Sequence, residues 1–276
     1  MLLTINANNT NTVLGLCDSD GEKLYASWRV STQRDRMPDE WFALIAPLLI
    51  EGGYATASIQ AVIIGSVVPS ASRALVEMAR RRLTIEAVEV GADLDIGVRA
   101  LVDNPREVGP DRLANTVAAF TRYGGPAIVV DFGTATNFDV VSTNGDFLGG
   151  AIAPGLMVSL DALTGRAARL FSVDLALPQN AIGTNTTTNI QSGSILGHLL
   201  MVEGLVARIQ AELAEKASVI ATGGFAAIFA EASPSISAYD PDLTLNGLRL
   251  IYQRVVARSD ADRPHAPVHP AAKVHR

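Results

Sequence analysis

The chain has 276 residues, of which 48% are hydrophobic and 18% are charged, and this composition excludes a disordered protein and fits one large or two smaller domains. Its 28 acidic and 22 basic residues give a net charge of −6, which disfavours nucleic acid and anionic membrane surfaces as partners and favours a small-molecule ligand. Residues 1–6 have no basic segment before their apolar run, and no later apolar run reaches the length that spans a bilayer. We therefore expect a cytoplasmic protein.

The first elements in chain order are a predicted β-hairpin and the strands that follow it. Residues 3–21 contain two apolar stretches separated by a turn of small polar residues, and Asp20-Gly21 then supplies a tight turn. A third strand is predicted over 25–30 and a buried β-branched strand over 59–67.

The same order of elements returns in the second half of the chain. Residues 128–145 again form two apolar stretches around a small polar turn, and Asn144-Gly145 closes the second stretch. Further strands are predicted over 147–152 and 217–222. The repetition predicts a duplicated architecture.

Four helices are predicted from apolar residues spaced three and four apart, over 39–50, 70–83, 111–123 and 194–213. The last of these is apolar on more than one face. Its additional apolar residues indicate either burial between a sheet and a neighbouring helix or an interface between subunits, and both interpretations stay open.

Strand hairpins followed by helices, twice over, predict a two-lobed α/β protein with a cleft between the lobes. We place the N-terminal lobe at 1–122 and the C-terminal lobe at 123–258. Residues 259–276 are rich in Pro, Ala, Asp and His and are predicted to be a disordered tail.

The cysteine and histidines do not form a predicted metal centre. Cys17 is the only cysteine and is interpreted as a buried small apolar residue. His198, His265, His269 and His275 lack the spacing of a zinc site.

The polar turns of the two hairpins are candidate phosphate-binding elements. The chain has no G-x-x-x-x-G-K-[ST] sequence and no G-x-G-x-x-G after a strand, so any phosphate must be held in another way. Successive backbone N–H groups in a turn, together with Asn and Thr side chains, make a concave anion site. Two such turns facing each other can hold the β- and γ-phosphates of ATP, with Mg²⁺ between them.

Two further segments are open to two interpretations each. Gly223-Gly224, after the strand over 217–222, either lets an adenine ring lie against the backbone or forms an ordinary turn. Asp111 and Arg112 begin a predicted helix, where a carboxylate can deprotonate a substrate hydroxyl and a guanidinium can bind an anion. The alternative is that Asp111 only caps the helix and Arg112 is solvated.

Taken together, these motifs resemble those of the type III pantothenate kinases, which belong to the actin/Hsp70/hexokinase superfamily. The resemblance spans about residues 1–256. The matching motifs, in chain order, are Asn9-Thr10-Asn11-Thr12, Asp103-Asn104-Pro105, Glu107-Val108-Gly109, Asp111-Arg112, Asp131-Phe132-Gly133-Thr134-Ala135-Thr136, the glycine-rich run 149–155, Ile182-Gly183, Asn185-Thr186 and Ala221-Thr222-Gly223-Gly224.

The resemblance implies a duplicated actin-like (ribonuclease H-like) fold and an activity, the ATP-dependent phosphorylation of pantothenate as the first step of coenzyme A biosynthesis. It implies Asp111 as the general base, and a homodimer with the substrate pocket near the subunit boundary. The pantothenate site would contain Gly109, Pro110, Asp111, Arg112 and Thr186. ATP would be bound by Asn6, Ala7, Asn8, Asn9, Thr10, Asn11, Thr12, Val13 and Thr134, with Gly223 and Gly224 beside the adenine.

The resemblance also implies two cations, and the chain departs from the family pattern near one of them. Asp131 would bind a monovalent cation, K⁺ or NH₄⁺. Asn6 and Asn8 stand where the family has Asp and Gly, so Asn6 would be a weakened Mg²⁺ ligand. Val102 and Pro110 replace the more usual Tyr and Ala.

Two alternatives to this function stay open. A relative with weakened or lost catalysis, acting as a nucleotide- or metabolite-binding regulator, is suggested by Asn6. A superfamily kinase for a sugar or for acetate is disfavoured by the segment 103–112.

Overall fold

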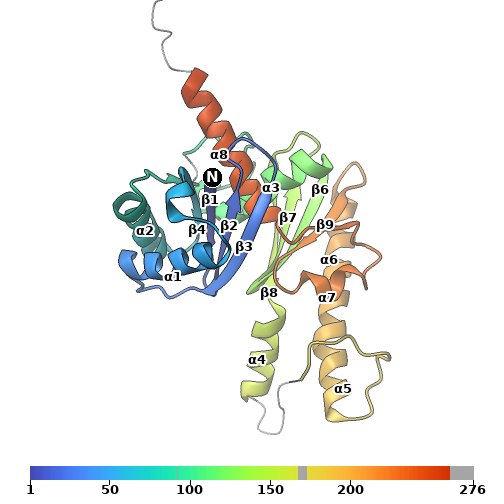
Figure 1. Ribbon diagram of the computed structural model, residues 1–276. Coiled ribbons are helices and arrows are strands. Elements are labelled where there is room, and N and C mark those ends of the chain that lie inside the picture. The colour runs from blue at the N-terminus through green and yellow to red at the C-terminus, as the bar shows by residue number, and fades with distance from the viewer. Residues whose placement is uncertain (92, 167–172, 262–276) are drawn as a thin grey trace, which may run out of the picture.

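The computed structural model describes residues 1–91, 93–166 and 173–261, and its strands form two five-stranded sheets (Figure 1). The first sheet has the order β3-β2-β1-β4-β5 and the second has the order β10-β9-β6-β7-β8. The strands are β1 (Leu2–Ala7), β2 (Asn11–Cys17), β3 (Leu24–Ser31), β4 (Ala61–Ser66), β5 (Val88–Glu89), β6 (Ala127–Phe132), β7 (Ala135–Val141), β8 (Phe147–Pro154), β9 (Ser218–Thr222) and β10 (Ala238–Tyr239).

The second sheet repeats the first strand for strand. β1 pairs antiparallel with β2 and parallel with β4, and β6 pairs in the same way with β7 and β9. A register shift interrupts the pairing of the second and third strands at the same place in both sheets, at Leu16/Cys17 and at Val140/Val141. The duplicated two-lobed α/β architecture predicted from the sequence repeat is confirmed.

Helices cover both faces of each sheet. α1 and α2 pack on one face of the first sheet, and α4, α6 and α7 pack on one face of the second. The helices are α1 (Pro38–Glu51), α2 (Pro69–Met78), α3 (Pro110–Tyr123), α4 (Leu156–Arg166), α5 (Thr186–Ile190), α6 (Gly197–Glu212), α7 (Ala226–Ala230) and α8 (Leu243–Ala261), with π-helical turns at Ala79–Leu83 and Gln191–Leu196 and 3₁₀ turns at Thr56–Ser58 and Pro105–Glu107.

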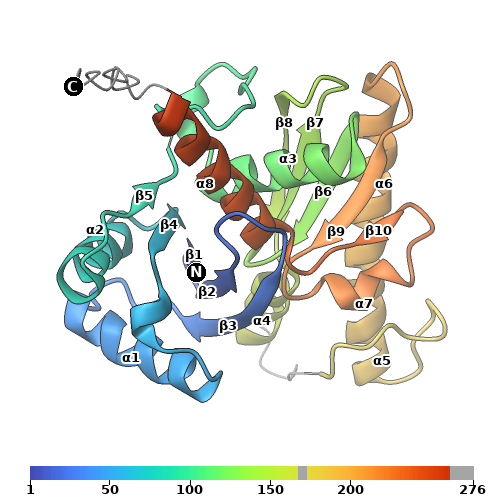
Figure 2. The same ribbon diagram turned by 45° about the horizontal axis from the view of Figure 1, so that its top comes forward.

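The helices α3 and α8 lie side by side between the two sheets (Figure 2). Leu113 and Val117 of α3 pack with Leu248 of α8 against the first sheet, whereas Ala119 of α3 packs against the second. The two helices approach closely at Gly247, where an added Cβ would lie 2.0 Å from the carbonyl oxygen of Ala114. This contact requires glycine, and it fixes the helix start that carries Asp111.

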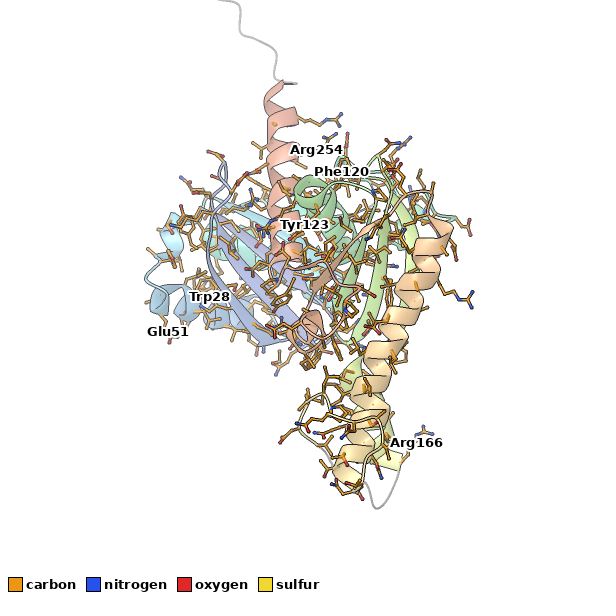
Figure 3. The ribbon with its side chains drawn as sticks, turned by 90° about the vertical axis from the view of Figure 1, so that its right-hand side faces the viewer. Trp28, Glu51, Phe120, Tyr123, Arg166 and Arg254 are labelled. Carbon is orange, nitrogen blue, oxygen red and sulfur yellow. The ribbon has the colours of Figure 1, made fainter. Side chains whose placement is uncertain are left out.

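The predicted helix over 194–213 is longer in the structure, since α5, the π-helical turn and α6 form one continuous helix, Thr186–Glu212, of 27 residues. The threonine-rich start has low helix propensity, which is why the sequence pattern missed it. It is stabilised by a capping box, in which the Asn185 side chain accepts a hydrogen bond from the Thr188 backbone N–H over 3.0 Å. Figure 3 shows its first half projecting from the sheets beside α4, whose last residue, Arg166, is labelled.

This continuous helix also corrects the expectation that no segment is long enough to span a bilayer. By length and composition, this helix could cross a membrane. Its most apolar window has a mean hydropathy of 1.3, and 33% of that window is buried in the structure. Core helices of soluble proteins pass the same test, and Ile195, Val202 and Val206 pack here against the second sheet. One apolar face of this helix is therefore buried against the sheet, whereas Leu200 is exposed, so the role of its additional apolar residues stays open between the two predicted interpretations.

The lobe boundaries at 122 and 258 stay predictions. α8 belongs to the C-terminal lobe in sequence but packs on the first sheet. It runs to Ala261, so the predicted tail begins as helix, and residues 262–276 of that tail lie outside the described residues. Cys17 is fully buried, as predicted.

Candidate active site

The turns that join β1 to β2 and β6 to β7 lie face to face. Oγ1 of Thr134 donates a hydrogen bond to Oγ1 of Thr10 over 2.8 Å, although the two residues come from different halves of the chain. Within the turns, the Asn8 N–H donates to the Asn11 carbonyl over 3.0 Å, and the Gly133 N–H donates to the Ala135 carbonyl over 2.9 Å. The predicted meeting of the two polar turns is thus confirmed.

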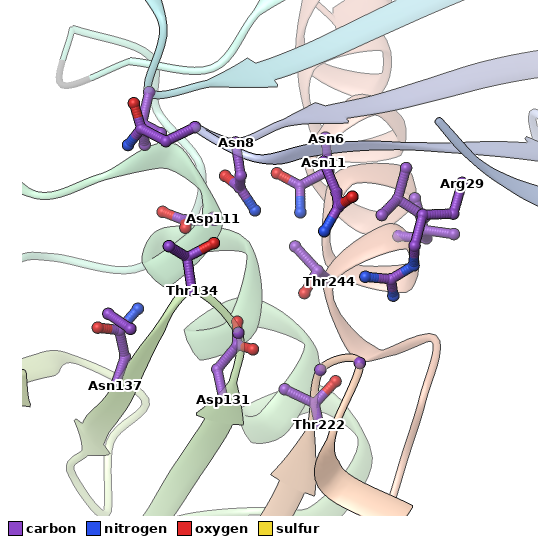
Figure 4. Close-up of a pocket in the computed structure, with 18 of the residues that line it drawn as sticks. Asn6, Asn8, Asn11, Arg29, Asp111, Asp131, Thr134, Asn137, Thr222 and Thr244 are labelled. Carbon is purple, nitrogen blue, oxygen red and sulfur yellow. The ribbon is translucent and has the colours of Figure 1, made fainter. Parts of the chain in front are cut away.

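A pocket opens beside these turns, between the two sheets and the start of α8 (Figure 4). It is lined mainly by small and polar residues from both halves of the chain. The lining residues are Asn6, Asn8, Asn9, Asn11, Val13, Arg29, Val67, Asp111, Asp131, Gly133, Thr134, Ala135, Asn137, Thr222, Gly223, Gly224, Pro241, Thr244 and Leu245.

The predicted nucleotide-binding block 6–13 is divided between two faces of the first sheet. Asn6, Asn11 and Val13 point into the pocket. Ala7 and Thr12 are cross-strand partners that are fully buried on the opposite face, and Thr12 shares a hydrogen bond with Thr32 there. The division follows from the two-residue period of a strand, so Ala7 and Thr12 present only backbone atoms to the pocket side.

Asp111 occupies the first turn of α3 at the wall of the pocket. Its Oδ1 accepts a hydrogen bond from the backbone N–H of Arg112 over 2.9 Å. A Cβ on Gly109 would lie 2.5 Å from the same oxygen, so glycine is required before this helix, and Pro110 then takes the first helical position. Burial raises the pKa of Asp111 above its usual range, against the opposing effect of Arg112.

Arg112 is held from two sides and lies just outside the pocket lining. Its Nε donates to Oδ1 of the fully buried Asp139 over 2.5 Å, and its Nη2 donates to the Phe138 carbonyl over 3.1 Å. The guanidinium also lies over the Phe147 ring, at 5.0 Å from its centroid. Burial raises the pKa of Asp139 to about 6, even though the charge of Arg112 lowers it. Among the described residues, Nη1 of Arg112 has no hydrogen-bond partner.

Asp131 is the second-last residue of β6, lines the pocket and packs closely against Gly223. A Cβ on Gly223, whose φ is +94°, would lie 2.4 Å from Oδ1 of Asp131. Burial, together with the negative charges of Asp111 and Asp139, raises the pKa of Asp131 to about 7, against the opposing effects of the Asn115 amide and the charge of Arg29. A carboxylate in such surroundings is stabilised by a bound cation.

Two oxygen atoms of the first turn lack any partner within the described residues. They are Oδ1 of Asn6 and Oδ1 of Asn8, both buried. Amide oxygens of this kind are ligands for hard cations such as Mg²⁺. No group of three or more His, Cys, Asp or Glu side chains in the described part of the chain is arranged to hold a metal ion by itself, so a cation bound by Asn6 or by Asp131 would need phosphate oxygens or other ligands as well.

Thr186 is not among the residues that line this pocket. It is the exposed first residue of α5, at the end of the projecting helices in Figure 1. The structure therefore brings together Asp111, Asp131, Thr134 and the glycine pair, but not Thr186.

Several residues that line the pocket or contact its carboxylates had no sequence signal of their own. Asn115 lies on α3, and its Nδ2 is 3.3 Å from Oδ2 of Asp139 and 3.5 Å from Oδ2 of Asp131, while its Oδ1 accepts from Thr244 over 2.7 Å. A buried amide in the middle of an apolar helix face was the one available hint. The residues missed by sequence reasoning are Arg29, Asn137 and Thr244 in the lining, and Asn115 and Asp139 beside it.

Changing Arg112→Met is expected to lower the free energy of unfolding by about 3–5 kcal/mol, because it leaves the Asp139 carboxylate buried without its cation. The double variant Arg112→Met/Asp139→Asn should recover part of that loss. Urea denaturation at neutral pH measures both.

The matched control is the Arg99–Asp146 ion pair, which has a similar N–O distance of 2.6 Å but an Arg99 side chain that is 74% exposed. Arg99→Met should cost much less than Arg112→Met, because solvent screens the exposed Arg99 guanidinium. Equal losses at Arg99 and Arg112 would show that burial does not distinguish the two pairs.

Comparison with known proteins identifies the family. The family model for "Type III pantothenate kinase" matches residues 2–208. A type III pantothenate kinase of Thermomicrobium roseum is 47% identical over 255 residues, covering 92% of this chain and 98% of that one. One of Acidothermus cellulolyticus is 48% identical over 257 residues, covering 93% and 99%.

Solved structures with low identity share the fold. A putative Baf family transcriptional activator from Campylobacter jejuni has a TM-score of 0.58 at 18% identity and covers 91% of this chain and 98% of its own. The activator of 2-hydroxyisocaproyl-CoA dehydratase from Clostridium difficile, with bound ADPNP, has a TM-score of 0.56 at 12% identity and covers 98% and 99%. The predicted actin-like class is thereby confirmed, and the chain belongs to the type III pantothenate kinase family.

Proposed function

We propose that this chain transfers the γ-phosphoryl group of ATP to the primary hydroxyl of pantothenate, giving 4'-phosphopantothenate in the first step of coenzyme A biosynthesis. The observation that carries the proposal is the contact between the two polar turns, Thr10 and Thr134, beside the carboxylate of Asp111. Membership of the kinase family supports it. Phosphoryl transfer asks mainly for positioning and charge neutralisation, and this arrangement is suited to both.

In the proposed mechanism, Asp111 is the general base. The carboxylate orients the substrate hydroxyl and accepts its proton as the oxygen attacks the γ-phosphorus. Gly109 and Pro110 form the wall of the pantothenate site at the start of α3, and Nη1 of Arg112 binds the pantothenate carboxylate. Since Asp139 and Phe138 already fix this guanidinium, little rotamer freedom is lost on binding.

The nucleotide lies along the two turns in this proposal. Residues 6–13 and Thr134 bind the β- and γ-phosphates through backbone N–H groups and the side chains that line the pocket. Gly223 and Gly224 lie beside the adenine. Asn6 would contribute an oxygen ligand to Mg²⁺, whose charge would neutralise the phosphates, and Asp131 would hold a monovalent cation, K⁺ or NH₄⁺.

The Asp111→Asn variant is expected to lower kcat by about 100- to 10,000-fold, because the amide cannot accept the proton. ADP affinity should be unchanged or tighter, since the variant removes a negative charge from the pocket. Steady-state turnover assays measure kcat, and isothermal titration calorimetry measures ADP affinity.

The proposed role of Asp111 as general base also predicts how kcat depends on pH. Burial raises the pKa of Asp111 above its usual value of 3.8, so the reactive carboxylate is lost as the pH falls through that raised pKa. The kcat profile of the wild type should therefore fall on the acid side at a pH above 3.8. An acid limb that persists unchanged in Asp111→Asn would assign it to another group.

The chain is proposed to act as a homodimer in the cytoplasm, with Thr186 of one copy completing the pantothenate site of the other. Thr186 does not reach the pocket of its own chain, and the projecting helices around it expose large apolar side chains. Those apolar residues are Val158 (43% exposed), Leu163 (40%), Ile182 (85%) and Leu200 (57%).

A mixing experiment tests this shared site. Asp111→Asn and Thr186→Arg are each expected to be nearly inactive alone. In a two-fold dimer, co-refolding equal amounts should restore about a quarter of wild-type turnover, because half of the dimers are mixed and each has one intact site. Absence of recovery, with mixed dimers present by native mass spectrometry, would place Thr186 outside the partner's site.

The substrate assignment is tested by ADP release with pantothenate, acetate and glucose. Turnover is expected with pantothenate only, and only when Mg²⁺ and K⁺ or NH₄⁺ are present. Binding of ATP without turnover on any of the three would support the regulator alternative instead. In that assay Asn6→Asp should raise Mg²⁺ affinity, and should raise turnover where Mg²⁺ binding limits it, since it adds a full negative charge to the proposed Mg²⁺ ligand.

A further inference from the structure

Arg29 reaches the pocket from the third strand of the first sheet. It lies on β3 opposite Val13 of β2, which also lines the pocket. Its neighbours Trp28 and Val30 pack on the other face, against the core formed with α1 and α2. Because successive side chains of a strand alternate between faces, this packing directs Arg29 toward the second lobe.

The guanidinium of Arg29 lies above the glycine pair. A Cβ on Gly224 would be 3.0 Å from Nη1 and 3.5 Å from Cζ of Arg29. Figure 4 shows the side chain entering the pocket from the side opposite Asp111, with Thr222 below it. Arg29 thus faces the segment proposed to lie beside the nucleoside, away from the site of phosphoryl transfer.

Arg29 makes no hydrogen bond or ion pair with any residue that the structure describes. Other arginines near the cleft do have partners, since Arg112 pairs with Asp139 and Arg34 donates to Asn9. Arg29 is also the only cationic side chain among the lining residues, which include two carboxylates. An arginine directed into a pocket without a protein partner is available for an anionic ligand.

The kind of ligand that Arg29 would bind follows from the shortage of cationic groups in the cleft. The chain has no P-loop lysine, and the two turns contribute neutral donors. A planar guanidinium with several N–H groups matches two phosphate oxygens at once. The terminal phosphates belong next to Asp111, so the phosphates within reach of a side chain above Gly224 are those nearer the nucleoside.

We propose that Arg29 binds the α- and β-phosphates of the nucleotide and supplies the cationic contact that the two turns do not. The proposal rests on the proposed function only in that a nucleotide occupies this cleft. Arg29 is then a positioning residue for ATP. It touches no atom that changes bonds in the transfer.

Nucleotide titration tests the proposal without any turnover. Arg29→Gln should weaken ADP binding by about 10- to 100-fold, the loss expected for a charge-assisted hydrogen bond. Adenosine binding should change by less than about twofold, because adenosine has no phosphate. Arg29→Lys, which keeps the charge but not the planar fork, should fall between wild type and Arg29→Gln.

Arg73→Gln is the matched control, since Arg73 is exposed on α2 and outside the pocket, and it should leave both affinities unchanged. In turnover, Arg29→Gln should raise the KM for ATP by a similar factor and leave kcat and the KM for pantothenate nearly unchanged. Circular dichroism and thermal melts establish that the variants are folded.

Two outcomes would overturn the proposal. Equal losses for ADP and adenosine would mean that Arg29 contacts the base, and an unchanged ADP affinity would mean that it contacts no nucleotide. Failure of the wild type to phosphorylate pantothenate would count against the proposed function alone, because the ADP titrations do not depend on the second substrate.

Discussion

The electrostatics of the cleft depend on three carboxylates that the fold brings to the start of α3. Asp111, Asp131 and Asp139 come from three different elements, and each is removed from bulk water strongly enough to raise its pKa. Within the described residues only Arg112 forms an ion pair with any of them. Like charges in a region of low dielectric repel strongly, so this arrangement favours a site that takes up cations together with its substrates.

The three carboxylates can lie close together because glycines allow neighbouring elements to approach closely at three positions. Gly247 lets α8 approach α3, Gly109 leaves room for the carboxylate of Asp111, and Gly223 leaves room for that of Asp131. Asn115 then bridges the carboxylates of Asp131 and Asp139 from α3 and is itself bonded by Thr244 of α8. The duplicated sheets supply the two turns, and the two helices between the sheets hold the turns and the carboxylates in register.

Much of this was accessible from the sequence because it is local. The two-residue period of the strands and the repeated turn chemistry around 8–12 and 133–134 predicted both hairpins and their contact. What escaped prediction depends on tertiary packing. Arg29, Asp139 and Asn115 are single polar residues on β3, β7 and α3. None belongs to a sequence motif that would mark it as a site residue. The helix start at Thr186 was missed since capping by Asn185 outweighed weak propensity.

The charge balance also gives a physical interpretation of Asn6, the residue that most separates this chain from the family pattern. Its Oδ1 is buried and has no partner within the described residues, so an oxygen ligand is retained at this position. A carboxylate there would add a fourth negative charge to a cleft in which the pKa of Asp131 is already raised to about 7, and would disfavour ionisation of Asp111, the proposed base. Compared with a carboxylate, Asn6 therefore binds a cation more weakly but allows Asp111 to ionise more easily. That exchange suits an enzyme better than a regulator, because only the enzyme needs the ionised base.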